Sequence, residues 1–503
     1  MEQRDFLGLD PKACYRALKS RDARFDGRLF VGVTSTGIYC RPICPARSPK
    51  SENCRFFSSA AAAQESGFRP CLRCRPETAP DLGSWRGTSN TVSRGLALIA
   101  EGALDGEEAG VDALAERLGV GGRQLRRLFQ QHLGASPITV AQTRRVLFAK
   151  QLIHDTRLPM AEIAMAAGFG SVRRFNETFQ QLFRRPPGAL RRKAVLALPE
   201  GSVGEMGVDV RLSYRPPYDW TAMLGFLKAR AIDGVEWIEG DLYCRTVALA
   251  QDGLTGTVEI SHLPDRASLN ATIRFPSVRA LPAIVARIRR VFDLGADVAA
   301  IGAHLAQDPL LAPLIAERPG LRAPGGWDGF ELAVRAVLGQ QVTVEAARRL
   351  AGRLVQICGT SLPAGQHGRP ALRLAFPTAA QVARADLSAL GTPVARKRAL
   401  AALAEAALQD PALFQPQGTV EETVARLRAI RGIGEWTAHY IALRAVRETD
   451  AFPASDIGLL RGAAIRVGAR PSPALLQDRA ETWRPWRAYA AQHLWAADQA
   501  AHG

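Results

Sequence analysis

Residues 427–438, Leu427-Arg-Ala-Ile-Arg-Gly-Ile-Gly-Glu-Trp-Thr-Ala438, form the stretch that decides the fold of the C-terminal half of this 503-residue chain. The pattern predicts a helix, a tight hairpin built on Gly432 and Gly434, and a second helix. The glycines allow backbone N–H groups at the start of the second helix to approach a phosphate, which the helix dipole also favours. Alone, the motif indicates either sequence-independent contact with a DNA backbone or merely a tight turn between helices.

Asp456 gives this hairpin a chemical context. It follows the hairpin by about twenty residues, in the segment Phe452-Pro-Ala-Ser-Asp456-Ile-Gly. This placement resembles that of the catalytic aspartate in the helix-hairpin-helix DNA glycosylases. Further segments at 214–227, 333–342 and 483–495 are similar to 3-methyladenine DNA glycosylase II (AlkA type), so the resemblance extends over about residues 208–498.

The resemblance implies a site that receives a base extruded from the duplex, because the glycosidic bond is inaccessible inside the stack. Asp456 would stabilise an oxocarbenium-like sugar or direct water to it. Glycosylases that also cleave the strand have a Lys two residues after the second hairpin glycine. This chain has Trp436 there, so a monofunctional enzyme without a Schiff base is expected. The resemblance assigns the base pocket to Trp436, Tyr440, Trp495 and Phe226, and duplex contacts to Gly432, Gly434, Gln340 and Gln341.

The resemblance leaves two features of the excision site open. The pocket aromatics could instead be ordinary core residues. Gln341 stands where the best-known family pattern has Leu, and Ile457 stands where an aromatic residue is often found. The duplex wedge and the shape of the pocket are therefore not fixed by the resemblance.

Charge and cysteine content separate the front of the chain from the back. The formal charge of the whole chain is +17, and residues 1–200 carry +12 of it. Eight cysteines are too few for a disulfide scaffold in so long a chain, and six of them precede residue 80. With 47% hydrophobic residues and no apolar run of about 18 residues, a disordered chain and a membrane span are both disfavoured. The excess positive charge indicates a polyanionic partner, and we expect a cytoplasmic protein.

Two close cysteine pairs, Cys40/Cys44 and Cys71/Cys74, have the spacing that a tetrahedral Zn²⁺ with four thiolates requires. Cys14 and Cys54 have no partner at ligand spacing and are expected to be inert. A purely structural zinc site is one interpretation of this pattern.

The surrounding segments, from Arg24-Phe-Asp-Gly to Tyr39-Cys40-Arg-Pro and at Gly67-Phe-Arg-Pro, favour more than a structural site. They resemble the N-terminal domain of the bacterial adaptive-response (Ada) regulator over roughly residues 5–78. The resemblance implies methyl transfer from DNA methylphosphotriesters to Cys40, with Arg47 and Arg69 in contact with DNA. Since methylation would remove negative charge from the cysteine cluster, it should strengthen DNA binding.

Residues 92–192 are typical of successive helices and contain two similar helix pairs, at 111–129 and 160–179. Each pair has an Ala/Leu-rich helix, a glycine-containing turn and an Arg-bearing helix, which is the helix-turn-helix pattern. The two copies resemble the AraC-type DNA-binding domain; a helical bundle with a basic face is the alternative. Four phenylalanines are expected in the core: Phe129, Phe169, Phe175 and Phe179. Five arginines are expected to face DNA: Arg123, Arg126, Arg127, Arg173 and Arg174.

The expected fold class is multidomain and mainly α with α+β parts. A small four-cysteine zinc domain spans 5–80, an all-α double helix-turn-helix domain 88–195, a small antiparallel β/α domain 207–282, and an all-α helix-hairpin-helix glycosylase core 283–500. Strands are predicted at 208–212 and 257–260, and a loop between helices near 359–370. Linkers are predicted at Pro76–Gly87 and Pro199–Gly207.

The leading hypothesis is a methylation-sensing transcriptional activator fused to an alkyl-base DNA glycosylase. Its partners would be Zn²⁺, double-stranded DNA and RNA polymerase, with no membrane, and it would act as a monomer. One alternative is a transcriptional regulator whose C-terminal half binds DNA without catalysis. Another is a metal or redox sensor with an AraC-type output.

Overall fold

The computed structural model describes residues 11–80, 90–105, 110–191, 207–249, 253–363, 369–416 and 419–502. The chain divides into two compact units, Met1–Tyr214 with Ser277–Ala286 (unit 1) and Arg215–Pro276 with Arg287–Gly503 (unit 2). Most of both predicted linkers, residues 81–87 and 199–206, lies outside the described residues. Within the described ranges, no helix has the length and apolar character needed to cross a membrane.

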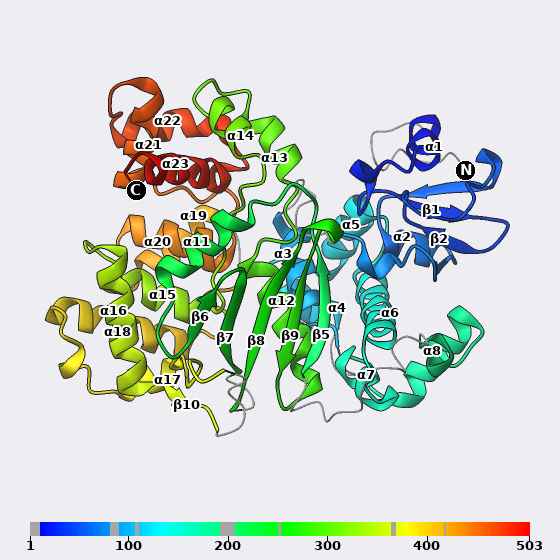
Figure 1. The fold of residues 1–503 in the computed structure, drawn as a ribbon, viewed down its shortest axis with the longest axis horizontal. Helices are drawn as coiled ribbons and strands as arrows, with labels where there is room; N and C mark the ends of the chain where they lie inside the picture. The colour runs from blue at the N-terminus through cyan, green and yellow to red at the C-terminus, as the bar shows by residue number, and fades with distance from the viewer. Residues whose placement is uncertain are drawn as a thin grey trace. The chain divides into compact units, whose positions relative to one another are not determined.

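The N-terminal part of unit 1 is a small α+β domain around a four-stranded sheet in the order β3-β1-β2-β4 (Figure 1). The first three strands pair in antiparallel fashion, and β4 runs parallel to β2. This parallel pairing brings the residues after β2 and β4 to the same edge of the sheet. The elements are α1 (Pro11–Lys19), β1 (Phe30–Val33), β2 (Ile38–Cys40), β3 (Cys54–Phe57), α2 (Ala60–Glu65) and β4 (Arg69–Pro70).

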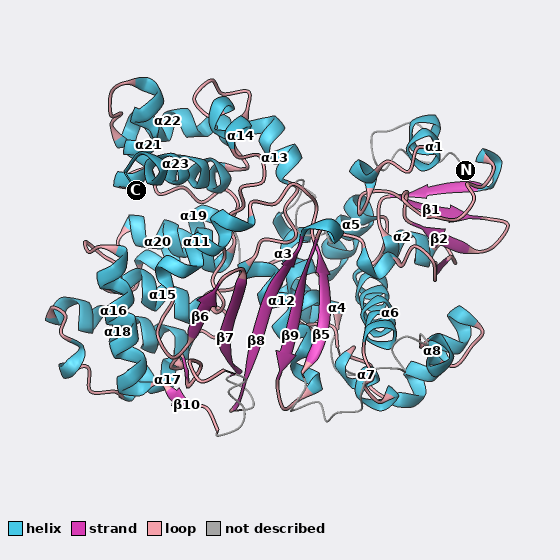
Figure 2. Ribbon diagram, viewed as in Figure 1, coloured by secondary structure: helices cyan, strands magenta, loops and turns pink. Residues whose placement is uncertain are grey.

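The following helices confirm the two predicted helix pairs, which flank the long helix α6 (Figure 2). Phe129, Phe175 and Phe179 are fully buried, as expected. Phe169 is only half-buried, because it lies at the rim of the motif. Its ring packs edge to face with that of Phe175, with 5.2 Å between the ring centres. The helices are α3 (Asn90–Ala100), α4 (Val111–Arg117), α5 (Gly122–Leu133), α6 (Pro137–Asp155), α7 (Met160–Ala166) and α8 (Val172–Phe183).

A buried charge network joins the cysteine-rich domain to α6. Lys150 is fully buried and donates from Nζ to Glu77 Oε2 at 2.6 Å and to the Cys71 carbonyl at 2.9 Å. Arg75 bridges Glu77 and Asp155, each at 3.0 Å. Burial alone would raise the pKa of Glu77, but hydrogen bonds and the neighbouring cations lower it to about 2. The junction thus holds its carboxylate ionised.

Unit 2 begins with an antiparallel sheet and continues in helices. Its strands lie in the order β9-β8-β7-β6, with β8 pairing along ten residues, Leu254–Leu263. Strands were predicted at 208–212 and 257–260, and both are confirmed by β5 and β8. The elements of the chain from residue 208 up to the helical part are β5 (Val208–Ser213), α11 (Trp220–Arg230), β6 (Glu236–Glu239), β7 (Leu242–Leu249), β8, β9 (Ser268–Arg274) and α12 (Leu281–Val291).

The predicted return to helices from about residue 283 is also confirmed. The loop expected near 359–370 includes β10 (Thr360–Ser361), which pairs with β11 (Leu374–Ala375) beyond the predicted range. Helix α21 packs along α23, and α20 packs on α15 and α19 (Figure 1). The helices are α13 (Val298–Leu305), α14 (Ala312–Glu317), α15 (Gly329–Leu338), α16 (Val344–Cys358), α17 (Ala379–Arg384), α18 (Val394–Gln409), α19 (Val420–Arg428), α20 (Glu435–Ile441), α21 (Ile457–Val467), α22 (Pro473–Ala480) and α23 (Arg487–His502).

The Glu77→Gln substitution should loosen the junction. It leaves Lys150 buried without its counter-charge, a loss that typically costs about 3–5 kcal/mol. Amide hydrogen exchange along α6 should therefore become faster. Glu52→Gln is the matched control, since Glu52 pairs with Lys50 at 3.8 Å on the exposed surface. Equal protection of α6 in both variants would contradict this role of Glu77.

The same pair predicts a pH dependence. The folded pKa of Glu77 lies near 2, below its ordinary value of 4.5. Its contribution is therefore complete above about pH 4.5 and is lost as the pH falls toward 2. Wild-type protection of α6 should decline through that window more steeply than protection in Glu77→Gln.

Candidate functional site

The four cysteines of the two predicted pairs come together at one edge of the small sheet. Cys40 ends β2 and Cys71 directly follows β4, so the parallel strands deliver one member of each pair to the same place. The four sulfur atoms lie within 4.8 Å of one another. Cys14 packs elsewhere in the apolar core, and the Cys54 thiol donates to the Lys50 carbonyl.

This donor set suits Zn²⁺. A tetrahedral site with Zn–S bonds of about 2.3 Å places its sulfurs about 3.8 Å apart, within the observed spread. Hydrogen bonding among the thiols lowers the pKa of Cys44 to about 7, chiefly through Cys40, and raises the pKa of Cys40 itself. Four thiols so close can all ionise only if they share a cation. Backbone amides of Arg41 and Arg73 each donate to a cluster sulfur at 3.3 Å.

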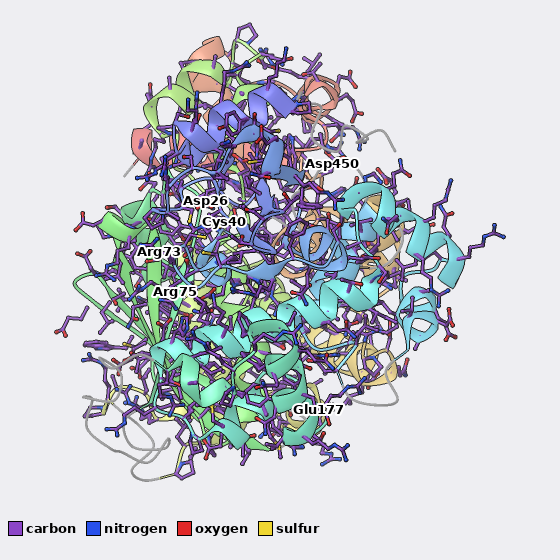
Figure 3. All side chains as sticks on the ribbon, turned by 90° about the vertical axis from the view of Figure 1, so that its right-hand side faces the viewer. Asp26, Cys40, Arg73, Arg75, Glu177 and Asp450 are labelled. Atoms are coloured by element: carbon purple, nitrogen blue, oxygen red, sulfur yellow. The ribbon has the colours of Figure 1, made fainter. Side chains whose placement is uncertain are left out.

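The four cysteines differ in exposure. Cys44, Cys71 and Cys74 are buried, whereas Cys40, the predicted methyl acceptor, is half-buried. Figure 3 labels Cys40 with Asp26, Arg73 and Arg75 in this domain. Asp26 is buried and pairs with the guanidinium of Arg41, which also donates to the Cys74 carbonyl at 3.2 Å. The buried Asp26–Arg41 ion pair therefore packs against the cysteine cluster, and the Cys40 sulfur remains partly accessible.

Three basic residues lie on the segments that carry the two cysteine pairs. Of the two predicted DNA contacts, Arg47 is exposed and Arg69 is half-buried in β4. Arg73 is exposed between the two cysteines of the second pair, and sequence reasoning missed it. Its position between the two cysteines of Cys71-Leu-Arg-Cys74 is the feature of the sequence that indicates it.

The predicted helix-turn-helix arginines are accessible on their helices. All five predicted residues are exposed on α5 and α8, while Phe129 and Phe175 on the same helices are fully buried. Arg173 is held by Glu177 at 2.8 Å and Arg126 lies 3.5 Å from Asp112. These exposed pairs are weak and leave the guanidinium groups accessible to phosphates.

In unit 2, the carboxylate of Asp456 is held by two of the predicted pocket residues. One oxygen accepts from Trp436 Nε1 at 2.6 Å and the other from Trp495 Nε1 at 2.8 Å. Asp456 also caps α21 by accepting from the Leu459 amide at 3.0 Å. Three N–H donors therefore hold the Asp456 carboxylate, and the N-terminus of α21 stabilises its negative charge further.

The four predicted aromatic residues belong to one cluster, and two of them, Trp436 and Trp495, contact this carboxylate. Trp436 and Tyr440 stack at 5.3 Å, and Tyr440 meets Trp495 edge-on at 6.3 Å. Phe226 joins them through the buried guanidinium of Arg444, 4.7 Å from its ring. All four rings are half-buried. They are therefore not closed core residues, and each keeps surface available to a ligand.

The hairpin needs the first of its two predicted glycines for steric reasons. Gly432 has φ +88°, and a Cβ there would lie 2.4 Å from Cβ of Ala399. Gly434 is the N-cap of α20, and open space lies where its Cβ would be. The amides at this helix start are thus accessible.

The predicted wedge segment is tied to the hairpin. Gln340 donates to the Gly432 carbonyl at 3.0 Å and to Thr437 Oγ1 at 3.1 Å. Gln341 is exposed with φ +55°, beside the exposed Val342. A strained, exposed residue tied to the predicted hairpin fits the expected insertion into a duplex. Thr437 and Val342 are further residues that sequence reasoning missed.

Three domain families match the chain. The metal binding domain of Ada matches residues 13–77, a helix-turn-helix domain matches 114–193, and the AlkA N-terminal domain matches 209–328.

Individual relatives cover more of the chain. A Mycobacterium tuberculosis protein described as a probable bifunctional transcriptional activator/DNA repair enzyme AlkA is 42% identical over 487 residues, which are 97% of this chain and 96% of that protein. DNA-3-methyladenine glycosylase 2 of Escherichia coli is 37% identical over 289 residues, 56% of this chain and 95% of its own. The solved 3-methyladenine DNA-glycosylase of Archaeoglobus fulgidus has the same fold over 57% of this chain and 98% of its own, with a TM-score of 0.50 and 20% identity.

Zinc content tests the ligand set. Cys71→Ser replaces a thiolate by a poor zinc ligand and should lower the zinc bound per chain well below that of the wild type, measured by elemental analysis after dialysis against a chelator. Cys54→Ser is the control within the same domain and should retain the metal. Equal zinc in both variants would exclude Cys71 as a ligand.

Proposed function

The chain belongs to the family of bifunctional transcriptional activators and DNA repair enzymes of the AlkA type, and on this premise we propose that it excises alkylated bases from DNA and reports DNA methylation through Cys40. One observation carries the excision half. The carboxylate of Asp456 is fixed by two indole N–H groups inside a half-buried aromatic cluster that adjoins a helix-hairpin-helix.

Excision proceeds at the glycosidic bond of a nucleotide turned out of the duplex. The hairpin amides bind the backbone, Gln340 holds the wedge, and Gln341 with Val342 enters the gap left in the stack. The base lies against Trp436, Tyr440, Trp495 and Phe226. As the bond breaks, its electron pair leaves with the base, and water adds to the sugar to give an abasic site and a proton.

Asp456 acts electrostatically in this step. Its carboxylate accepts three hydrogen bonds, and its negative charge faces the positive charge that develops on the sugar. A strong general acid is unnecessary, because N-alkylation already makes the purine a good leaving group. Trp436 stands where a strand-cleaving enzyme has Lys, which supports hydrolysis without a covalent intermediate. A non-catalytic C-terminal half would have no need for this arrangement.

The cysteine cluster is proposed to accept a methyl group from a DNA methylphosphotriester. Zn²⁺, when bound by the four cysteines, would keep their sulfurs deprotonated and nucleophilic. The Cys40 sulfur attacks the methyl carbon, an S–C bond forms, and the C–O bond breaks as the phosphodiester leaves with the electron pair. The reaction is stoichiometric, since the thioether product has no route back. Arg47, Arg69 and Arg73 would position the phosphate.

Methyl transfer changes the charge of the cluster. A thiolate becomes a neutral thioether, so the domain loses one negative charge and is repelled less by DNA phosphates. The arginines of α5 and α8 would then hold a promoter in the major groove, with the chain acting as a monomer and contacting RNA polymerase. The domains proposed for this division of labour are 5–80, 88–195, 207–282 and 283–500.

Asp456→Asn tests the excision half. Asn still caps α21, so the fold should persist, but the charge facing the sugar is lost. Release of 3-methyladenine from methylated duplex DNA should fall by at least about a hundredfold. Asp478→Asn, a change at an exposed position of α22, should leave release unchanged. Retained excision in Asp456→Asn would remove Asp456 from the mechanism.

Mass spectrometry tests the acceptor. Incubation with DNA carrying methylphosphotriesters should add one methyl group to Cys40, the half-buried cluster cysteine, and none to Cys54. Cys40→Ser should take up no methyl group. If Cys40 stays unmodified after prolonged incubation with excess methylphosphotriester DNA, the cluster is a structural site only.

A further inference from the structure

Arg444 lies against the aromatic cluster and has no role in the function proposed above. It sits in the π-helical turn Ala442–Val446 that continues α20, and it is 2% exposed. Its guanidinium carbon lies 4.7 Å from the ring centre of Phe226, 5.1 Å from Trp495 and 5.7 Å from Tyr440. Three of the four rings of the cluster thus already contact a buried cation.

The hydrogen-bond partners of Arg444 are neutral. Nη1 donates to the Pro324 carbonyl and Nη2 to Gln492 Oε1, each at 2.8 Å. Within the described part of the chain, no carboxylate forms an ion pair with it. Two other buried arginines of unit 2 are paired with acids: Arg245 with Glu331 at 2.8 Å, and Arg487 with Asp450 at 2.9 Å. Arg444 therefore retains an uncompensated charge where burial makes that charge costly.

Burial lowers the pKa of Arg444 to about 10, which still leaves the side chain cationic at neutral pH. The Arg444 guanidinium is connected to Asp456 through the ring of Trp495. Trp495 presents its ring to Arg444 and donates its Nε1 proton to Asp456 at 2.8 Å. A cation and a carboxylate are thus separated by one indole. In a partly buried site, such a field is only weakly screened.

We infer that Arg444 sets the electrostatic preference of the excision site: it opposes positive charge on the bound base and favours movement of that charge to the sugar beside Asp456. The inference rests on the proposed function. An N-alkylated purine in DNA is cationic, and it becomes neutral when the glycosidic electron pair passes to it. The sugar gains the positive charge at the same moment. A fixed cation near the base and a carboxylate near the sugar both favour this shift.

Arg444 changes how strongly the aromatic cluster attracts a cationic base. Electron-rich rings alone would bind a cationic base best before reaction and would slow its departure. With a guanidinium already against these rings, part of that attraction is cancelled in the ground state. Arg444 is thus a positioning and specificity residue acting through the rings.

Gln492→Glu tests the charge without removing the side chain. The Glu carboxylate can accept the same bond from Nη2 and neutralises the guanidinium in place. For release of 3-methyladenine from methylated duplex DNA, kcat and KM should both fall by roughly tenfold, so that kcat/KM changes less than either. Gln499→Glu, the same substitution on an exposed part of α23, should change neither parameter.

Two variants at position 444 separate charge from packing. Arg444→Met should reproduce the paired fall of kcat and KM, whereas Arg444→Lys should retain most of the wild-type values because it keeps the cation. Unchanged kinetics in Gln492→Glu would overturn the inference, even if Arg444→Met fails to fold. A loss in Arg444→Lys as large as in Arg444→Met would also overturn it, since hydrogen bonding would then be the function.

The outcome for Asp456 keeps the two proposals apart. If the wild type excises the base and Asp456→Asn does not, normal kinetics in Gln492→Glu reject only the role of Arg444. If the wild type excises nothing, the proposed function fails and this inference fails with it.

Discussion

The paired indole hydrogen bonds to Asp456 are the interaction on which the excision site depends. They join three helices at one carboxylate: Trp436 comes from α20, Trp495 from α23, and Asp456 itself caps α21. Any shift of one helix would break a bond to the charged group. The rings proposed to face a base are therefore positioned by the same contacts that hold the carboxylate proposed to be catalytic, so binding geometry and electrostatics are set together.

Both units contain compensated buried charges, and Arg444 in unit 2 contrasts with them. In unit 1, the charges are compensated: Lys150 pairs with Glu77, Arg75 bridges Glu77 and Asp155, and four cysteines are arranged to share a metal. The contact of Lys150 with the Cys71 carbonyl places the helix between the two DNA-binding motifs directly on the cysteine loop. In unit 2, Arg444 is left without an acid partner among the described residues beside the aromatic cluster. A buried charge without a counter-ion can act electrostatically on a ligand bound beside it.

Local patterns in the sequence predicted what depends on short spacing. The cysteine pairs predicted all four cluster members, the glycine hairpin predicted the turn before α20, and the repeated helix pairs predicted α4–α5 and α7–α8. Phe169 was placed too deep, because periodicity does not distinguish the rim of a motif from its centre. Lys150 and Glu77 are 73 residues apart, and Arg444 and Gln492 are 48 apart. Nothing in either local segment specifies its partner, so these contacts required the folded chain.

One chain is proposed to carry two separable responses to alkylated DNA. The direct measurement compares wild type, Cys40→Ser and Asp456→Asn in two assays on the same preparations: release of 3-methyladenine, and promoter affinity before and after exposure to methylphosphotriester DNA. We expect that Cys40→Ser excises normally but gains no affinity, and that Asp456→Asn gains affinity but does not excise. Loss of both responses in either variant, or of neither, would contradict the proposal.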